Sequence, residues 1–408
     1  MINKLTKILI VLIACVSVLL GFLWFKYQEP DSNAIRVTCT GDIYYDLNFT
    51  GWIEENAFED YFEPIQPLLK SDLTIGNLVQ TIGTSDATKE NEEGEKEITE
   101  FPNSYLETLT TAYKGLGFDF FTCANMQSRR KGREAINHTL DVLDENKLGH
   151  TGINRSQEEQ ETIAIKKARD AKVAILSYTT KVYDSAVYEE DYDEEITYDV
   201  NVILDEDGNF DMAHKKKIKQ DVAYAKEKAD VVLVAMNWGN EYTYNIDQNQ
   251  IVITNYLNSL GVDMIIGNHP HISQKADVLT NANGEKTYVF YSLGSLINAG
   301  YAKPGDVVDE TGVNMAQASS VVTFELVPGE EGYEMDNVKV IPVINHYEKG
   351  YDNFQLIPLR EYTDTQASKH AQSKYSANFN TRWFWEQYHA LYDTYKLLSE
   401  ERVNAEKE

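Results

Sequence analysis

Short apolar runs recur along most of the chain, and each ends at small or polar residues that favour a loop. Runs of this length and composition are typical of buried strands, whereas segments of helical length and composition lie between several of them. The predicted strands span residues 35–40, 73–77, 118–124, 173–178, 231–236, 264–267 and 288–293, and the predicted helices span residues 135–147, 157–171, 215–229 and 248–260. This alternation predicts an α/β fold in which helices cover the strands of a sheet.

The charge balance argues against general nucleic-acid binding. The 408 residues carry a formal net charge of −28 at pH 7, whereas nucleic-acid binding rests on clustered Lys and Arg that neutralise phosphates. An anionic ligand would need a metal ion or a local basic cluster to overcome this negative field. Arg129, Arg130 and Lys131 form such a cluster in the sequence.

The amino-terminal region predicts a single-pass membrane anchor. Lys4 and Lys7 precede eighteen uncharged residues, from Ile8 to Phe25, and this length just spans the hydrocarbon core at about 1.5 Å per residue. The positive flank predicts that residues 1–7 stay in the cytoplasm and that the bulk of the chain lies outside the cell membrane. Alternatively, Cys15 is the lipidated residue of a lipoprotein, which would tether the chain to the same face.

The remaining chain predicts one large domain. Residues 26–34 are the expected linker, residues 35–342 the main domain, and residues 343–408 a Tyr-rich segment that ends in a helix, residues 382–402. The aromatic side chains of this helix are expected to pack on the main domain, with a partner-binding stripe as the open alternative. Two acidic stretches, residues 86–100 and 184–199, are expected to be solvated loops, with adventitious cation binding as the alternative. Cys39 and Cys123 are expected to be buried free thiols, with a disulfide between them as the open alternative.

Polar residues directly follow several predicted strands, where ligands gather in α/β sheets. Asp42 follows a glycine that allows a sharp turn. His269 and His271 flank a proline, a spacing that lets both imidazoles point into one cavity. Together with Asn125 and Asn237, these residues are the predicted ligands of one divalent metal ion of unknown identity.

In this order, the loops resemble the CapA family of capsule and poly-γ-glutamate synthesis proteins, also called PgsA. The matching stretches are Gly41-Asp42, residues 61–65, residues 76–78, Ala124-Asn125, Gly132, Thr139-Leu140, Gly152, residues 238–242, residues 269–271 and residues 290–294. The resemblance implies a calcineurin-like metallophosphoesterase fold, a layered α/β sandwich whose strand-end loops form a metal centre. It also implies a membrane-anchored role in making or exporting an anionic surface polymer, with membrane-bound polymer synthase subunits as partners.

Several side chains of the family's site are replaced in this chain. Val79 stands for a Glu, Gln127 for a His, Arg130 for an Asp, and Asn237 and Asn268 each for a His. A valine cannot bind a metal ion, and an amide cannot transfer protons near neutral pH as a histidine does. The site therefore resembles a degenerate metallophosphoesterase centre, and the sequence leaves open whether the protein is an enzyme.

Three functions remain open from the sequence. The first is a non-catalytic protein whose cavity binds polymer or synthase subunits. The second is a single-metal hydrolase, a phosphoesterase or amide hydrolase, with Asp42 as ligand or base and Glu241 in proton transfer. The third is a surface protein of another role on the same scaffold. Arg129, Arg130 and Trp238 are the candidate substrate contacts, and the alternative for the arginines is that they support the start of the following helix.

Overall fold

The computed structural model describes residues 34–392, apart from residues 56, 87, 91–95, 99, 184–196, 299–309 and 331. The chain divides into two units, Met1–Ile35 and Arg36–Glu408, and the fold described below is that of the second. The predicted membrane anchor, residues 8–25, and Cys15 lie outside the described residues. Within the described part of the chain, no helix has both the length and the apolar character needed to cross a bilayer.

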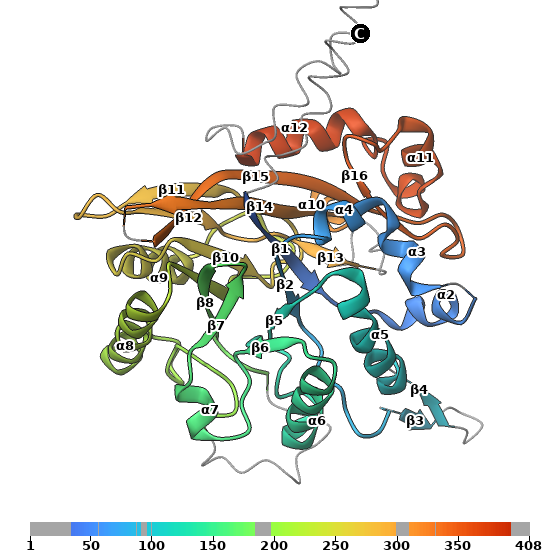
Figure 1. Ribbon diagram of the computed structural model, residues 1–408. Coiled ribbons are helices and arrows are strands. Elements are labelled where there is room, and N and C mark those ends of the chain that lie inside the picture. Colours follow the sequence, from blue (N-terminus) through green and yellow to red (C-terminus); the bar gives the residue numbers. More distant parts are fainter. Residues whose placement is uncertain are drawn as a thin grey trace, which may run out of the picture. The chain divides into compact units, whose positions relative to one another are not determined.

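The larger of two central sheets has eight strands (Figure 1). Its strands are β1 (Ile35–Ile43), β2 (Leu73–Leu78), β5 (Phe120–Thr122), β6 (Gly149–Thr151), β13 (Ser295–Ile297), β14 (Ala318–Gly329), β15 (Gly332–His346) and β16 (Gln355–Pro358). Their order is β16-β15-β14-β1-β2-β5-β6, and β13 also pairs with β1. The strands β1, β2, β5 and β6 are parallel, so their carboxyl ends lie at one edge of this sheet.

The second sheet has six strands in the order β11-β12-β10-β9-β8-β7. Its strands are β7 (Ala164–Ala168), β8 (Ala171–Thr179), β9 (Val231–Asn237), β10 (Met264–Asn268), β11 (Ala276–Thr280) and β12 (Lys286–Phe290). The four inner strands are parallel, whereas β7 and β11 pair antiparallel at the two edges. A separate hairpin joins β3 (Thr88–Glu90) to β4 (Lys96–Ile98).

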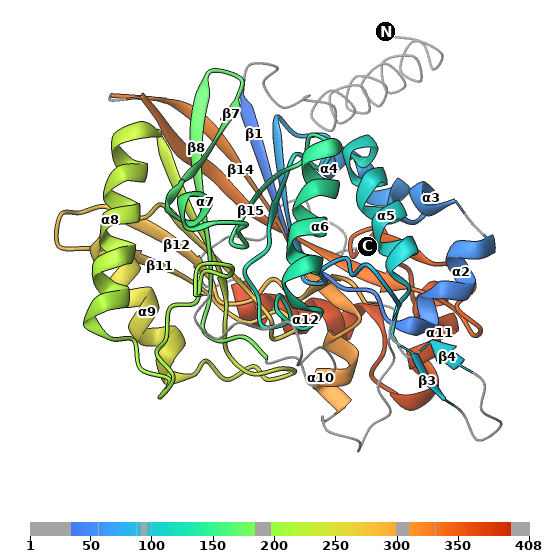
Figure 2. The same cartoon turned by 90° about the horizontal axis from the view of Figure 1, so that it is seen from below.

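Helices cover the outer faces of both sheets. They are α2 (Thr50–Glu55), α3 (Phe58–Phe62), α4 (Gln66–Leu69), α5 (Asn103–Leu116), α6 (Gly132–Glu145), α7 (Gln157–Glu161), α8 (Met212–Lys228), α9 (Gln248–Ser259), α10 (Glu310–Met315), α11 (Asp364–Lys369) and α12 (Thr381–Tyr392). Figure 2 shows α8 and α9 on one side of the strands and α5 and α6 on the other. Because β6 contacts β8 and β15 contacts β9, the two sheets pack together. The result is the predicted layered α/β sandwich.

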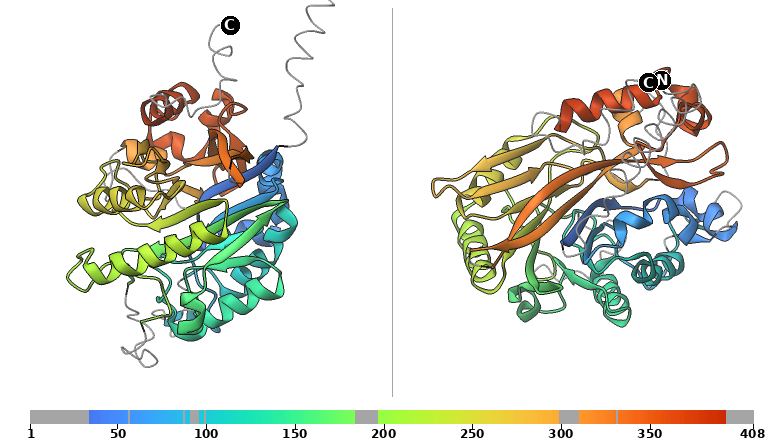
Figure 3. Two further views of the ribbon diagram at one scale, coloured as in Figure 1. Left: turned by 60° about the vertical axis from the view of Figure 1, so that its left-hand side comes forward. Right: turned by 45° about the horizontal axis from the view of Figure 1, so that its top comes forward.

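Each helix layer encloses its own apolar core. Ile253 and Leu257 of α9 pack with Val234 and Ile265 of the second sheet, and a separate core unites α5 and α6 with the first sheet. On the remaining face of β14 and β15 lies α12, as Figure 3 shows. Its Tyr388 hydroxyl donates a hydrogen bond to the Ser319 carbonyl at 2.9 Å. The described part of the predicted terminal helix therefore packs on the sheet.

Two local predictions were wrong. The helix expected over residues 157–171 ends at Glu161, and Ala164–Ala168 forms strand β7 instead. None of the residues of α7 is buried, so no apolar face holds the helix beyond its first turns. Most of the acidic stretch 184–199, residues 184–196, lies outside the described residues, but Asp199 at its end is fully buried rather than solvated. Cys39 and Cys123 are both buried and free, as one of the two alternatives predicted.

Candidate metal centre

A polar pocket with a volume of about 230 Å³ lies where the carboxyl ends of the parallel strands of both sheets meet. Its lining includes the predicted ligands Asn125, Asn237, His269 and His271, together with Glu241. The strands that carry these residues can approach one another closely because Gly41 and Gly267 precede the site residues. A Cβ atom at Gly41 would lie 1.9 Å from the Gly294 carbonyl oxygen, and one at Gly267 would lie 1.9 Å from that of Tyr291.

The loop after β10 carries both histidines in unusual backbone conformations. His269 has a backbone φ angle of 94° and His271 one of 60°, values that residues other than glycine rarely adopt. The Tyr242 backbone N–H donates to the Pro270 carbonyl at 2.8 Å, which ties this loop to the loop after β9. Such conformations cost free energy and persist where the surrounding structure fixes them, and they cluster at functional sites.

Asp42 connects the two sheets beneath the pocket. Its side chain is fully buried. One carboxylate oxygen accepts a hydrogen bond from the Asn77 amide at 2.7 Å, and the other accepts from the His269 backbone N–H at 3.1 Å. The second oxygen also lies 3.2 Å from Nδ1 of His271. Because Nδ1 of His271 faces this carboxylate, Nε2 is the ring nitrogen that remains for an ion.

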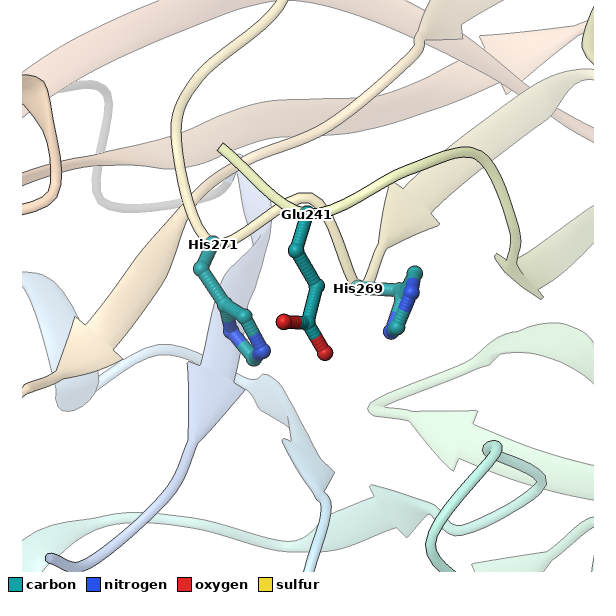
Figure 4. A group of neighbouring side chains, drawn as sticks. All are labelled: Glu241, His269 and His271. Atoms are coloured by element: carbon teal, nitrogen blue, oxygen red, sulfur yellow. The ribbon is translucent and has the colours of Figure 1, made fainter. Parts of the chain in front are cut away.

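Glu241, His269 and His271 bring their ligand atoms within 4.8 Å of one another. Figure 4 shows the Glu241 carboxylate between the imidazoles of His271 and His269. Two imidazoles and one carboxylate form a donor set that suits a single transition-metal ion such as Zn²⁺. Three protein ligands leave a coordination position for a substrate or a water molecule. The residues present therefore fit one metal ion.

The protonation of the two histidines differs because their surroundings differ. Burial lowers the pKa of His269 to about 4, so its imidazole is neutral at pH 7 and has a lone pair for a metal ion. Burial alone would also lower the pKa of His271, but its hydrogen bond to Asp42 and the charge of that carboxylate raise this pKa above its usual value. Burial raises the pKa of Tyr242 to about 12, so this neighbouring phenol stays protonated.

The two predicted asparagine ligands lie at the pocket but use their side chains to hold its loops. The Asn125 side-chain oxygen accepts from the Gln127 backbone N–H at 2.9 Å. The Asn237 side-chain oxygen accepts from the Met126 backbone N–H at 3.1 Å and from the Thr179 hydroxyl at 3.2 Å. The carboxylate of Asp42 lies outside the cluster of Glu241, His269 and His271.

The replaced positions add no ionisable ligand to this cluster. Val79 and Gln127 line the pocket, where valine offers no donor atom and the glutamine only an amide oxygen. Asn268 is buried at the end of β10 and lines a small space between the sheets instead. Among the described His, Cys, Asp and Glu side chains, Glu241, His269 and His271 form the group that could hold an ion.

The three predicted substrate contacts lie in different surroundings. Trp238 is fully buried, and its indole N–H donates to the Tyr291 carbonyl at 2.8 Å. Arg129 forms an ion pair with the buried Asp199 at 2.5 Å. Arg130 lies nearer the surface, 2.7 Å from the Glu100 carboxylate. In this structure none of the three side chains lines the metal pocket.

The sequence predicts a role for Glu241 in proton transfer, whereas the structure places its carboxylate beside His269 and His271 as a third candidate metal ligand. A signal was present, because Glu241 follows strand β9 in the stretch 238–242 that resembles the family. Ser295, whose hydroxyl oxygen lies 3.1 Å from Nδ1 of His271, was missed. It comes directly after the matching stretch 290–294, and only the pairing of β13 with β1 brings it to the site.

The fold and this pocket define an α/β protein with a candidate single-metal centre at its strand ends. The chain belongs to the family described as bacterial capsule synthesis protein PGA_cap, which it matches over residues 36–300. This confirms the resemblance seen in the sequence.

Two curated relatives carry the CapA name. The chain is 24% identical over 271 residues to the capsule biosynthesis protein CapA of Bacillus anthracis, and this match covers 66% of the chain and 61% of that relative. It is 22% identical over 307 residues to the PGA biosynthesis protein CapA of Bacillus subtilis, covering 72% of the chain and 73% of the relative.

Among solved structures, the calcineurin-like phosphoesterase YfkN of Bacillus subtilis aligns with a TM-score of 0.40 and 14% sequence identity, covering 76% of this chain and 90% of the other. A likeness of this size does not define the fold, which rests on the two sheets described above.

Proposed function

We propose that this protein takes part in the synthesis or export of an anionic cell-surface polymer, capsule or poly-γ-glutamate, as a membrane-anchored protein whose main domain is extracytoplasmic. Its family membership and the names of its relatives support the role. The apolar run from Ile8 to Phe25 supports the anchor. The net charge of −28 supports a partner other than nucleic acid.

The observation that carries the proposed mechanism is the convergence of Glu241, His269 and His271 on one side of the pocket. When bound there, a divalent cation supplies positive charge and an open position for a carboxylate of the polymer. Asp42 holds His271 in place through Nδ1. Tyr44 and Tyr242 also line the pocket, and their hydroxyls, protonated at neutral pH, offer hydrogen-bond donors to the ligand.

Metal analysis of the purified full chain tests this mechanism. We expect one divalent ion per chain after loading with Zn²⁺ or Mn²⁺, and loss of that ion in the variant His271→Ala with the fold retained. Polymer binding, measured with a soluble poly-γ-glutamate, should fall with the metal. Two tightly bound ions per chain, or polymer binding that ignores the metal, would contradict the proposal.

A second candidate function, a single-metal hydrolase, is favoured by the pairing of Asp42 with His271. A buried carboxylate 3.2 Å from Nδ1 of His271 orients that imidazole so that Nε2 would face an ion in the pocket. An ion held there would lower the pKa of a water molecule at its open position, which is the chemistry that a hydrolase needs. Turnover of a phosphodiester or amide substrate by the metal-loaded protein, abolished in His271→Ala, would establish this function. Binding without turnover would favour the non-catalytic role.

The proposed partners are membrane-bound polymer synthase subunits. Co-purification of such subunits with the full chain, and its loss when residues 1–33 are removed, is the expected result. If the chain purifies without them and polymer production does not depend on it, the protein has another surface role on the same scaffold.

A further inference from the structure

A second hollow, with a volume of about 130 Å³, adjoins the metal pocket. Tyr44, Asp46 and Gln127 line both spaces, so they form a shared rim. Arg130, Lys131 and Thr81 line only the second hollow. The second hollow therefore lies next to the metal pocket and has a lining with different chemistry.

Lys131 contributes a buried ammonium group to this lining. It is only 9% exposed, and its ammonium group donates to the Asn103 side-chain oxygen at 2.6 Å. That oxygen also accepts from the Gly83 backbone N–H, so it is shared between two donors. An ammonium group has three N–H donors, and a buried charge is costly unless it is paired. Burial accordingly lowers the pKa of Lys131 below its usual value.

The other charges of the hollow leave Lys131 as its available cation. Arg130 lies 2.7 Å from the Glu100 carboxylate, and the charges of these two side chains neutralise each other. The acidic neighbours Glu100 and Asp86 favour the charged form of Lys131. Asp46 on the shared rim is the remaining acidic side chain of the lining. The lining thus has equal numbers of acidic and basic groups in a chain whose net charge is −28.

Thr81 provides an independent indication of a ligand. Its side chain is only 4% exposed, and its hydroxyl has no hydrogen-bond partner among the described residues. A buried hydroxyl without a partner costs free energy, which a ligand acceptor in the hollow would recover. Thr81 precedes helix α5 in the sequence and Lys131 follows it. The fold brings these two residues to the lining of one hollow.

We infer that the second hollow is a carboxylate subsite, in which Lys131 and the Thr81 hydroxyl bind one acidic group of a ligand whose neighbouring group lies at the metal centre. This inference rests on the proposed binding of an anionic polymer and names the second contact of that polymer with the site. It also divides the basic triplet of the sequence, since Arg129 pairs with Asp199 and Arg130 with Glu100.

Calorimetric titration of the metal-loaded full chain with a γ-linked tetraglutamate tests the subsite. We expect Lys131→Met, which keeps most of the unbranched side chain but removes the ammonium group, to weaken binding about tenfold or more, as expected for loss of a hydrogen bond to a charged group. Metal affinity should not change. Lys286→Met, an exposed position on β12, is the matched control and should bind as the original protein does.

Thr81→Val separates a ligand contact from a purely structural role and guards against misfolding of the lysine variant. Removing an unpaired buried hydroxyl should leave the protein equally stable or more stable, yet binding of tetraglutamate should fall several-fold. Unchanged binding in both Lys131→Met and Thr81→Val would overturn the subsite. If His271→Ala abolished tetraglutamate binding in that case, the proposed function would survive. If binding depended on Lys131 but not on metal, the subsite would survive and the metal mechanism would fail.

Discussion

At the scale of single residues, Asp42 shows how a site residue can act without joining the metal ligands. Its carboxylate is fully buried and reaches Asn77, the His269 backbone and His271 at once. These contacts join β1 to the histidine loop after β10. A carboxylate in this position fixes the orientation of a ligand histidine and raises its basicity.

Asp42→Asn is therefore expected to weaken metal binding about 10- to 100-fold while the fold is retained. The amide keeps the size of the side chain but loses the charge that holds His271. Competition with a chromophoric chelator measures the affinity. Asp170→Asn, at an exposed turn between β7 and β8, is the control. If Asp42→Asn binds metal as tightly as the control does, Asp42 is not a positioning residue for the site.

The buried ion pair of Arg129 and Asp199 is a second feature of this scale. The two side chains are 14% and 0% exposed, respectively. Arg129→Met takes away the guanidinium group that neutralises a buried carboxylate, and we expect a loss of stability of roughly 3–5 kcal/mol. Urea unfolding followed by tryptophan fluorescence measures this change. Arg129→Met combined with Asp199→Asn should recover part of it, and a loss below about 0.5 kcal/mol in the single variant would contradict the assigned role.

These residues also show what the sequence could and could not predict. The loop positions of His269 and His271 follow from an apolar run that ends in polar residues, a local pattern. The partners of Arg129, Arg130 and Lys131 lie 70, 30 and 28 positions away in the sequence, respectively. No local pattern specifies pairings over such distances, so the division of the triplet was not predictable from the sequence.

At the scale of secondary-structure elements, the site depends on close contact between β1 and the loop after β12. Gly41 lies in β1 directly before Asp42, and the Asp42 backbone N–H donates to the Gly294 carbonyl at 2.9 Å. The absence of a side chain at Gly41 allows this approach, because a Cβ atom would lie 1.9 Å from the same carbonyl oxygen.

Gly41→Ala should therefore force β1 away from this loop and destabilise the protein by about 3 kcal/mol or more. Because Asp42 would move with the strand, metal binding should weaken as well. Gly51→Ala is the matched control, since no atom lies within 4 Å of a Cβ at that helical position, and it should be neutral or stabilising. Thermal unfolding of the two variants measures the difference. Equal melting temperatures would show that the contact tolerates a side chain.

Elements with a strong apolar pattern were predicted well, whereas those defined by their neighbours were not. The central strands β8, β9 and β10 are buried along almost their whole length and were visible as apolar runs. Strand β7 is half-buried and antiparallel to β8 at the edge of the sheet. Its sequence, Ala-Ile-Lys-Lys-Ala, has no clear period, so its pairing with β8 decides its conformation.

At the scale of the whole molecule, three buried histidines connect stability to pH. Burial lowers the pKa of His346 and of His269 to about 4 and that of His370 to about 3. His370 accepts a hydrogen bond from the Gln372 backbone N–H at Nδ1, and its Nε2 lies 2.8 Å from the Asn345 carbonyl oxygen. Its neutral form therefore satisfies both neighbours, whereas protonation at Nδ1 would break one contact.

The direction of the pH effect follows from these lowered pKa values. Between the usual value of 6.5 and the lowered values, the unfolded chain binds more protons than the folded chain. Stability from these histidines is complete above pH 6.5 and is lost as the pH falls toward 3. The raised pKa of His271 changes the stability in the opposite direction, but one such group faces three histidines whose pKa values are lowered. We expect a net loss on the order of 1 kcal/mol per pH unit for each buried neutral histidine.

The double variant His346→Gln and His370→Gln tests this account. It removes two titrating groups while keeping polar side chains, so the free energy of unfolding should depend less on pH between 6.5 and 4, even if the variant is less stable at pH 7. Urea unfolding at half-unit intervals of pH measures the slope. His138→Gln, at a partly exposed position beside Glu107, is the control and should retain the original slope. The same slope in the double variant would assign the acid sensitivity to carboxylates rather than to these two buried imidazoles, because protonation of native hydrogen-bonded carboxylates is the other general source of acid unfolding.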